Sequence, residues 1–350
     1  MMKKIAFLAA LAVSIYPATS GLAADGKAVA YVSNQNGGVT VIELDTLAPV
    51  ATIDIQAQGP RGIGITGDGK YVLTANKDSG NISVIDTATQ MVTKHIAIGK
   101  NPEFIRVYGN RAYVSYEPSA GEGKPEAEQG DKSEEKEKKL PAGIAVLDLD
   151  NWRVIKTMIS GPETEGIEFA PDGKLMLVTN EGDNTVTVYN LSTGKLVKTI
   201  NTTIYGDRPR GIKVSPDGKT YAVTLEFSDK LLLLNRRLKV LKTVPTGDAP
   251  YGLAFDRKGK RLFVAAARSK QLQVFNTQNY SLIKSIPVGA RCWHFSFTPD
   301  DARILVACGK SNDLYVIDAN TYELVKTISG LNTPWGVVTN PKAVGSLDRP

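Results

Sequence analysis

The sequence predicts an all-β fold, a seven-bladed β-propeller in which every blade is a four-stranded antiparallel sheet. Two observations carry this prediction. A unit of about 42 residues recurs from near residue 25 to the end, and each copy holds four short runs of β-branched or aromatic residues bounded by turn residues. Because one unit cannot bury its own apolar face, units must stack, and seven of them indicate a closed ring rather than an open solenoid.

The second strand of each unit has the most regular sequence, of the type LMLVTN. A short apolar run that ends in a polar turn predicts a buried strand. The predicted second strands are Ala30–Asn34, Tyr71–Asn76, Ala112–Tyr116, Leu175–Asn180, Thr220–Thr224, Arg261–Ala265 and Ile304–Cys308.

A further strand precedes each second strand except the first, and it should line the centre of the ring. These predicted inner strands are Gly62–Thr66, Phe104–Val107, Gly166–Ala170, Gly211–Ser215, Gly252–Asp256 and Phe295–Thr298. A seventh, Gly336–Asn340, closes the chain. We therefore expect three N-terminal strands and this one C-terminal strand to share a blade, which leaves no open sheet edge between the two ends.

We expect residues 1–24 to be a cleaved signal peptide. Lys3 and Lys4 precede an apolar stretch, Ile5–Ile15, that is too short to span a bilayer, and small residues follow at 22–24. Residues 25–350 should then form one propeller domain, periplasmic or secreted. Within it, residues 117–141 are dense in Glu, Lys, Gly and Pro, which predicts a charged flexible insertion, either a partner-binding flap or a solvated loop.

The composition excludes several classes of function. The formal net charge is +6, and without Lys3 and Lys4 it comes to 40 basic residues against 36 acidic ones, scattered mostly in turns. This balance predicts no nucleic-acid partner, and no later segment is apolar enough to span a membrane. The sequence lacks a Cys-x-x-Cys-His motif and a Gly-x-Ser-x-Gly motif, and it has two His residues, so a covalent haem, a serine triad and a multi-His metal centre are disfavoured.

Several segments resemble the YVTN-type β-propeller repeat. They include YVSNQNGGVTVIELDT from residue 31, LVTNEGDNTVTVYNLSTGKLVKTI from residue 177 and RPRGIKVSPDGKTYAV from residue 208. The resemblance covers the whole chain after the signal segment. It implies a seven-bladed propeller that is often exported, and related exported propellers are associated with quinone- or haem-dependent redox systems. It implies no particular activity, because this fold serves binding proteins, assembly factors and enzymes.

The residue that precedes each inner-strand Gly should reach the rim of the central channel. These rim residues are Arg61, Glu103, Glu165, Arg210, Tyr251, Trp293 and Trp335. In two units the Gly itself is replaced, by Phe104 and by His294. Solvent-facing aromatic residues grouped with convergent charges suggest a ligand or peptide site. The alternative is that large side chains plug the narrow end of the channel and that the Arg and Glu residues pair with one another.

Cys292, His294 and Cys308 form a second cluster. Antiparallel pairing of the strands around residues 293–298 and 304–308 brings the two Cys nearly opposite each other, close to disulfide range. A disulfide is the leading interpretation in an oxidising compartment. Two reduced buried thiols, or a zinc or copper site with His294, are the alternatives.

These observations favour an exported propeller that binds a small molecule or a periplasmic protein partner at its rim. It would be a monomeric, non-enzymatic accessory or scaffold of a redox or transport system, with no cofactor of its own. The alternative is an enzyme or a carrier of a haem-like, quinone or metal cofactor that uses His294.

Overall fold

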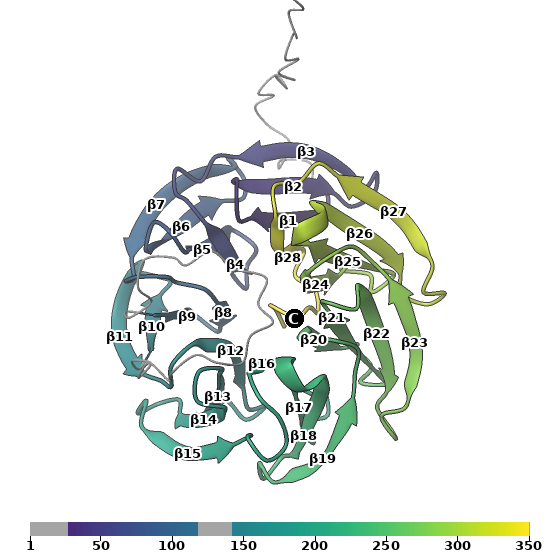
Figure 1. The fold of residues 1–350 in the computed structure, drawn as a ribbon. Coiled ribbons are helices and arrows are strands. Elements are labelled where there is room, and N and C mark those ends of the chain that lie inside the picture. The colour runs from purple at the N-terminus through teal and green to yellow at the C-terminus, as the bar shows by residue number, and fades with distance from the viewer. Residues whose placement is uncertain (1–26, 118–141, 350) are drawn as a thin grey trace, which may run out of the picture.

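The computed structural model describes residues 27–117 and 142–349, so the predicted signal peptide and nearly all of the predicted insertion lie outside the described residues. Seven four-stranded antiparallel sheets surround a central axis (Figure 1). This confirms the predicted seven-bladed propeller. Helical structure in the described residues is limited to two single turns, η1 (Glu226–Ser228) and η2 (Gly309–Ser311). No helix among the described residues is long and apolar enough to cross a membrane.

Each blade contributes one strand to each of four concentric positions. The inner strands are β4 (Pro60–Ile65), β8 (Ile105–Tyr108), β12 (Thr164–Phe169), β16 (Pro209–Val214), β20 (Pro250–Phe255), β24 (Cys292–Phe297) and β28 (Pro334–Asn340). The second strands are β1 (Val29–Asn34), β5 (Tyr71–Asn76), β9 (Arg111–Tyr116), β13 (Leu175–Asn180), β17 (Thr220–Leu225), β21 (Arg261–Ala266) and β25 (Arg303–Cys308).

The remaining two positions complete the sheets. The third strands are β2 (Val39–Glu43), β6 (Asn81–Asp86), β10 (Gly143–Asp148), β14 (Thr185–Asn190), β18 (Lys230–Asn235), β22 (Gln271–Asn276) and β26 (Asp313–Asp318). The outer strands are β3 (Ala48–Ile53), β7 (Met91–Ala97), β11 (Arg153–Ile159), β15 (Leu196–Asn201), β19 (Val240–Pro245), β23 (Leu282–Pro287) and β27 (Leu324–Ser329). Blade 1 holds β28 and β1–β3, and blades 2 to 7 follow in chain order from β4.

Blade 1 closes the ring. The inner strand β28 pairs antiparallel with β1, from Val29 opposite Asn340 to Asn34 opposite Pro334, while β2 and β3 complete the sheet. The predicted joining of three N-terminal strands to one C-terminal strand is therefore confirmed. The antiparallel ladder between β28 and β1 holds these two segments together and covers the edge that β1 would otherwise leave unpaired.

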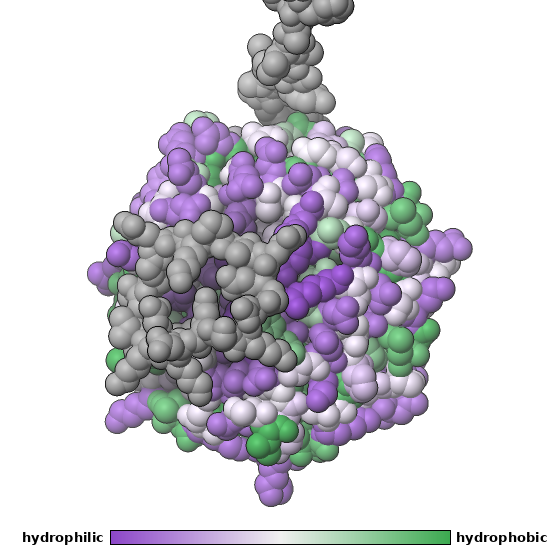
Figure 2. Space-filling view, in the orientation of Figure 1, coloured by the Kyte–Doolittle hydropathy of each residue, from purple (hydrophilic) through white to green (hydrophobic). Residues whose placement is uncertain are grey.

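The apolar core lies between neighbouring blades. In blade 5 the consecutive residues Leu231–Leu234 are all fully buried, which fits a strand covered on both faces. The outer strands alternate instead and leave apolar residues such as Leu196 and Leu324 half exposed. Figure 2 shows patches of hydrophobic side chains along the outer edge of the disc, between hydrophilic ones.

A repeated Lys protects the outer edges. It occupies the same register position in blades 2 to 7 and, in several of them, crosses to the next blade. Lys198 Nζ donates to Leu238 O at 2.9 Å, and Lys242 Nζ donates to Asn279 O at 2.8 Å. A charged side chain on an edge strand discourages pairing with another chain, and here it also joins neighbouring blades.

The chain does not stop at β28, because residues 342–349 return into the central channel. We call the end of the channel where inner strands begin the mouth and the opposite end the exit. At the exit, Ser346 N donates to Phe295 O at 2.9 Å and Phe297 N donates to Val344 O at 2.8 Å. Figure 1 shows the C-terminus at the centre of the ring. We call this segment the C-terminal plug.

Buried charges hold the C-terminal plug in place. Lys213 Nζ donates to the Asp348 carbonyl at 2.7 Å, and Arg349 Nη1 lies 3.0 Å from Glu168 Oε1. Arg106 Nη2 donates to the Ser346 carbonyl at 3.3 Å. Lys213, Glu168 and Arg106 come from three different inner strands, so the plug ties blades 3, 4 and 5 together from within.

Cys292 and Cys308 form a disulfide between the first residue of β24 and the last residue of β25. Their sulfurs are 1.99 Å apart, and the two residues are direct register partners with a Cα separation of 3.8 Å. The bond closes a loop with a sequence separation of 16 residues. A loop of that size is expected to stabilise the fold by about 3 kcal/mol, chiefly by restricting the unfolded chain.

Two C-terminal deletions should have different effects. Ending the chain after Pro341 keeps β28 but removes the partners of Lys213 and Glu168, so we expect a folded ring whose unfolding free energy falls by about 3 kcal/mol or more. Ending it after Gly330 also removes β28, which leaves β1 an open edge, and should abolish soluble folded protein. Urea unfolding followed by circular dichroism measures both effects. Wild-type stability in the longer deletion would refute the closure argument.

Candidate functional site

The mouth is built by a bulge in the inner strands. These strands begin about two residues earlier than predicted, at Pro60, Pro209 and Pro250 in blades 2, 5 and 6, because Pro is tolerated at the first position of a strand. Register shifts follow at once, so that Arg61 and Gly62 together oppose a single residue of β5. A bulge redirects one side chain, and here it turns the residue before the Gly into the channel.

Neighbouring inner strands approach closely at the bulge. Gly62 N donates to Glu103 O at 2.9 Å, and a Cβ at residue 62 would lie 2.5 Å from that oxygen. In blade 5 the Thr224 hydroxyl accepts from Gly211 N at 2.7 Å and donates to the Tyr251 carbonyl of blade 6 at 2.8 Å. The Gly and the hydroxyl residue of the repeat thereby fix the backbone of the next blade's rim residue.

The structure places all seven predicted rim residues at the mouth, on equivalent positions of the inner strands or the residues entering them. They divide into a charged half and an aromatic half, as the sequence order predicted. The expectation of solvent-facing aromatic residues is wrong. Tyr251 is 3% exposed, Trp293 6% and Trp335 1%, because they pack on each other's blades and on the central hydrophobic cluster.

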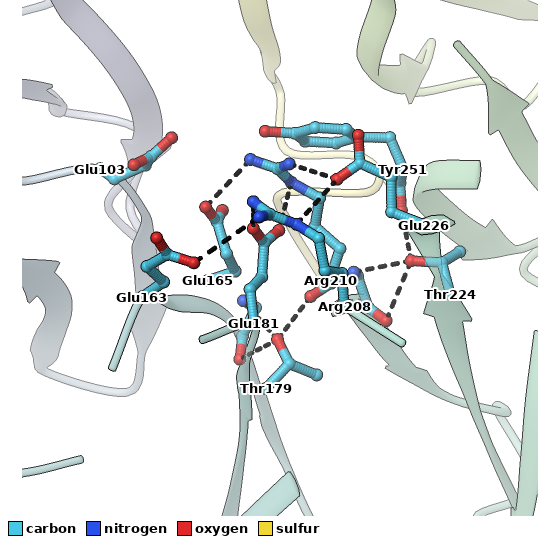
Figure 3. A network of polar contacts seen from close by, with 12 residues as sticks. Glu103, Glu163, Glu165, Thr179, Glu181, Arg208, Arg210, Thr224, Glu226 and Tyr251 are labelled. Carbon is cyan, nitrogen blue, oxygen red and sulfur yellow. Dashed lines mark hydrogen bonds and ion pairs between the residues drawn. The ribbon is translucent and has the colours of Figure 1, made fainter. Parts of the chain in front are cut away.

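The charged half extends into a network that we call the Arg–Glu cluster, shown in Figure 3. Arg210 contacts three carboxylates, with N···O distances of 3.0 Å to Glu165, 2.8 Å to Glu181 and 2.6 Å to Glu226. The guanidinium carbon of Arg210 also lies 3.8 Å from the centre of the Tyr251 ring, which joins the charged half to the aromatic half.

Arg208 lies beside Arg210 and contacts the same carboxylates. It forms an ion pair with Glu181, and its Nη1 and Nε lie 3.7 Å and 3.8 Å from Glu163 and Glu226. The members of the cluster are Glu163, Glu165, Glu181, Arg208, Arg210 and Glu226. Arg61 of blade 2 and Glu103 of blade 3 form a further buried ion pair.

Four members of the cluster were missed from the sequence. Glu181 and Glu226 directly follow the second strands β13 and β17. Glu163 and Arg208 stand two residues before a rim residue, in a left-handed turn with φ of 52° and 55°. Backbone pairing between the turns brings them together, because Glu226 N donates to Arg208 O at 2.9 Å and Glu181 N donates to Glu163 O at 2.9 Å. Equivalent residues repeat this pairing in other blades.

The cluster holds more negative than positive charge. Burial raises the pKa of Glu181 to about 7 against the opposing pull of Arg210 and Arg208, and burial raises the pKa of Glu165 well above its usual value. At Glu226 burial acts in the same direction, but Arg210 and Arg208 outweigh it and lower the pKa. The surrounding carboxylates hold Arg210 charged, with its pKa well above the usual value. Near neutral pH Glu181 is therefore partly protonated.

His294 lies just below the rim rather than on it. It is 4% exposed, and its ring centre lies 5.3 Å from that of Tyr251 and 4.3 Å from that of Trp335. Its Nδ1 is 3.1 Å from Ser346 Oγ of the C-terminal plug, while Nε2 has no hydrogen-bond partner. Burial, together with Arg210, holds its pKa well below the usual value. A cofactor role for His294 stays a prediction.

The disulfide changes the chemistry of the second cluster. With both sulfurs joined, neither Cys292 nor Cys308 offers a thiolate, so the alternative metal site with His294 lacks two of its three ligands. No group of three or more His, Cys, Asp or Glu side chains in residues 27–117 and 142–349 is placed to hold a metal ion.

Comparison with known proteins gives one partial family match. The model of a family described as "Lactonase, 7-bladed beta-propeller" matches residues 145–239, under a third of the chain. This segment contains all six members of the Arg–Glu cluster. No curated protein matches the sequence.

Solved structures match nearly the whole chain. Hydrazine synthase of Kuenenia stuttgartiensis is 19% identical, with a TM-score of 0.67 over 82% of this chain and 91% of that one. A functionally unknown protein of Desulfotomaculum acetoxidans is 17% identical, with a TM-score of 0.73 over 89% and 98%. The periplasmic gluconolactonase of Pseudomonas aeruginosa is 17% identical, with a TM-score of 0.70 over 89% and 98%. At these identities the likeness shows the fold.

Glu181→Gln should change how stability depends on pH. Glu181 has a folded pKa of about 7, above the 4.5 of the free side chain, so it favours folding at low pH and this contribution is lost as the pH rises from about 4.5 to 7. We therefore expect Glu181→Gln to gain stability over wild type across that window, by up to about 3 kcal/mol at its upper end. Urea unfolding at pH 4.5, 6 and 7.5 measures the difference.

The control is Asp172→Asn, which removes an exposed carboxylate at the exit end. The difference in unfolding free energy between this control and wild type should not grow as the pH rises. A Glu181→Gln variant whose difference from wild type is constant between pH 4.5 and 7.5 would contradict the assignment of the buried proton.

Proposed function

We propose that this protein is an exported, non-enzymatic binding propeller whose mouth takes up a cationic group of a small molecule or a protein partner, as an accessory or scaffold of a periplasmic redox or transport system. The observation that carries the proposal is the composition of the Arg–Glu cluster. Four carboxylates and two guanidinium groups, drawn from two adjacent blades, converge at the mouth in a largely buried position.

The excess of carboxylates favours a cationic ligand. Glu165 and Glu181 are fully enclosed, and the two Arg side chains already contact several carboxylates each. Burial raises the pKa values of Glu165 and Glu181, so these two side chains hold protons more readily than a free Glu does. A cation bound at the mouth would replace these protons and let the carboxylates ionise. An anion would meet the same surplus charge and be repelled.

Two observations support export. The predicted signal peptide at residues 1–24 would direct the chain out of the cytoplasm. The disulfide between Cys292 and Cys308 is of a kind that persists in oxidising compartments and is rare in the cytosol.

The proposal predicts that cation binding releases protons. Spermidine is a suitable probe because it is a small polyamine without an acidic group. We expect calorimetric titration at pH 6.5, in two buffers of different ionisation enthalpy, to show release of protons on binding. The double variant Glu165→Gln, Glu181→Gln should lose about tenfold or more in affinity and release no protons.

Asp172→Asn again serves as the control, because it alters an exposed carboxylate far from the mouth. If the binding enthalpy is the same in both buffers, no protons are released on binding, and this would count against the Arg–Glu cluster as the site. Equal affinity of the double variant and wild type would count against it as well. The control also removes a carboxylate from the protein. An effect of the double variant that the control does not share is therefore due to the cluster and not to the overall charge of the surface.

Lactone hydrolysis is the second candidate, and it belongs to a different class of function. The lactonase family model matches the segment that carries the whole Arg–Glu cluster. A carboxylate with a pKa of about 7, such as Glu181, suits a general base that activates water. Arg208 and Arg210 would then stabilise the negative charge that develops on the carbonyl oxygen. In this candidate Glu181, rather than His294, is the base.

A pH-stat assay tests this candidate directly. Glucono-δ-lactone and γ-butyrolactone cover the two common ring sizes. If the protein is a lactonase, Glu181→Gln should lower kcat by about 100-fold or more, as removal of a general base does, while Asp172→Asn leaves it unchanged. Hydrolysis no faster than in buffer alone would dismiss the enzyme and leave the binding proposal standing.

A further inference from the structure

A polar cleft lies between blades 2 and 3 at the exit end, on the opposite side of the disc from the mouth. It holds about 490 Å³, which is within the usual range for a small-molecule site. We call it the blade 2–3 cleft. The residues that matter here are Thr66, Asp68, Tyr71, Asn110, Asp150 and Trp152.

The cleft exists because one turn is short. In blades 2 and 4 to 7, five residues connect the inner strand to the second strand, for example 66–70 and 170–174. In blade 3 only Gly109 and Asn110 connect β8 to β9. Elsewhere the longer turns pack on one another, so that a Cβ at Gly218 would lie 2.8 Å from Pro171 of the preceding blade. The shortened hairpin of blade 3 leaves the corresponding space open.

One wall of the cleft is aromatic. Trp152 and Tyr71 meet edge to face, with ring centres 4.9 Å apart and an interplanar angle of 75°. Trp152 occupies the left-handed position of the turn between third and outer strands, with φ of 53°. The same conformation recurs at Leu47 and Tyr322, so it belongs to the repeat. What is particular to blade 3 is a half-buried indole beside an open space.

The remaining groups that line the cleft include both hydrogen-bond acceptors and hydrogen-bond donors. Asp68 accepts from the Thr66 hydroxyl at 2.6 Å and from Lys70 N at 3.1 Å, and these bonds hold its pKa below the usual value. Asn110 Nδ2 donates to Asp150, which orients both side chains. Two carboxylates against the single ammonium group of Lys70 disfavour a phosphate or another anion.

We propose that the blade 2–3 cleft binds a neutral pyranose sugar. A pyranose has one apolar C–H face, which packs on an aromatic ring, and a periphery of hydroxyl groups that each donate and accept hydrogen bonds. Trp152 supplies the ring, Asp68 and Asp150 accept, and Asn110 donates. The same chemistry fits a free monosaccharide or a sugar unit within a longer glycan, and the test separates these sources.

Tryptophan fluorescence gives a specific readout. The chain has three Trp residues, and Trp293 and Trp335 are 6% and 1% exposed, so a ligand in the cleft reaches Trp152 alone. We expect glucose, galactose or mannose, or their β-linked and α-linked oligosaccharides, to shift the emission in a saturable way. Tighter binding by oligosaccharides would identify the glycan as the source, and equal binding would identify the free sugar.

Two variants remove the cleft's function by different routes. Trp152→Ala should weaken sugar binding about tenfold or more, measured by calorimetry because its fluorescence signal is lost. Replacing Gly109-Asn110 with Ser-Pro-Asp-Gly-Lys, the turn of residues 215–219, should fill the cleft and abolish the fluorescence shift while Trp152 remains in place. Tyr322→Ala alters the equivalent turn of blade 7 and should leave sugar binding unchanged.

The outcomes separate clearly. A saturable shift that disappears in the hairpin variant, with unfolding free energy within about 1 kcal/mol of wild type, supports the proposal. No shift with any of these neutral sugars, a shift that survives in the hairpin variant, or a shift given only by amines such as choline would overturn it.

Discussion

The close approach of neighbouring inner strands at the bulge is the constraint on which the rest of the molecule depends. Gly62 can lie against Glu103 O only because it has no Cβ, and Thr224 bridges two blades with a single hydroxyl. These contacts set the spacing of seven sheets around the axis. The bulge also turns the side chain that precedes the Gly into the channel. The same short segment of an inner strand therefore contacts the next blade and places a residue at the mouth.

The two halves of the mouth follow from what each blade offers at these positions. In blades 6, 7 and 1 the rim residues Tyr251, Trp293 and Trp335 are large aromatic side chains that pack into the central cluster. That half acts as a plug. In blades 4 and 5 the rim residues are charged, and Arg210 pairs with Glu181 and Glu226 in the adjacent turns. The buried aromatic side chains and the mutual pairing of Arg and Glu both fit the alternative interpretation of the rim, and a ligand site there stays a prediction.

Strand positions could be predicted almost to the residue, because a strong apolar repeat with Gly and Asp turns leaves little freedom. The second strand Leu175–Asn180 has the predicted bounds, whereas the inner strands of every blade but blade 3 begin earlier, because the bulge carries no period-2 signal. In blade 3 the inner strand begins at Ile105, one residue later than predicted. The rim residues were found by counting from a Gly. Glu181 and Arg208 were not, since their approach depends on backbone pairing between two turns. The C-terminal plug has no repeat pattern, and nothing local places it inside the channel.

The channel is electrically asymmetric along its axis, and this bears on what its mouth can attract. Around the exit, Arg106, Lys213, Lys342 and Arg349 lie near the carboxylates of Glu168 and Asp348. Burial and the neighbouring Arg106 hold the pKa of Lys213 well below its usual value, as expected for a site with surplus positive charge. At the mouth, the Arg–Glu cluster brings four carboxylates against two guanidinium groups. The neutral His294 lies between the two ends, with Arg210 on one side and Arg106 and Lys213 on the other. On the proposed function, a cation that reaches the mouth would meet the carboxylates of the Arg–Glu cluster, while the C-terminal plug occupies the far end of the channel.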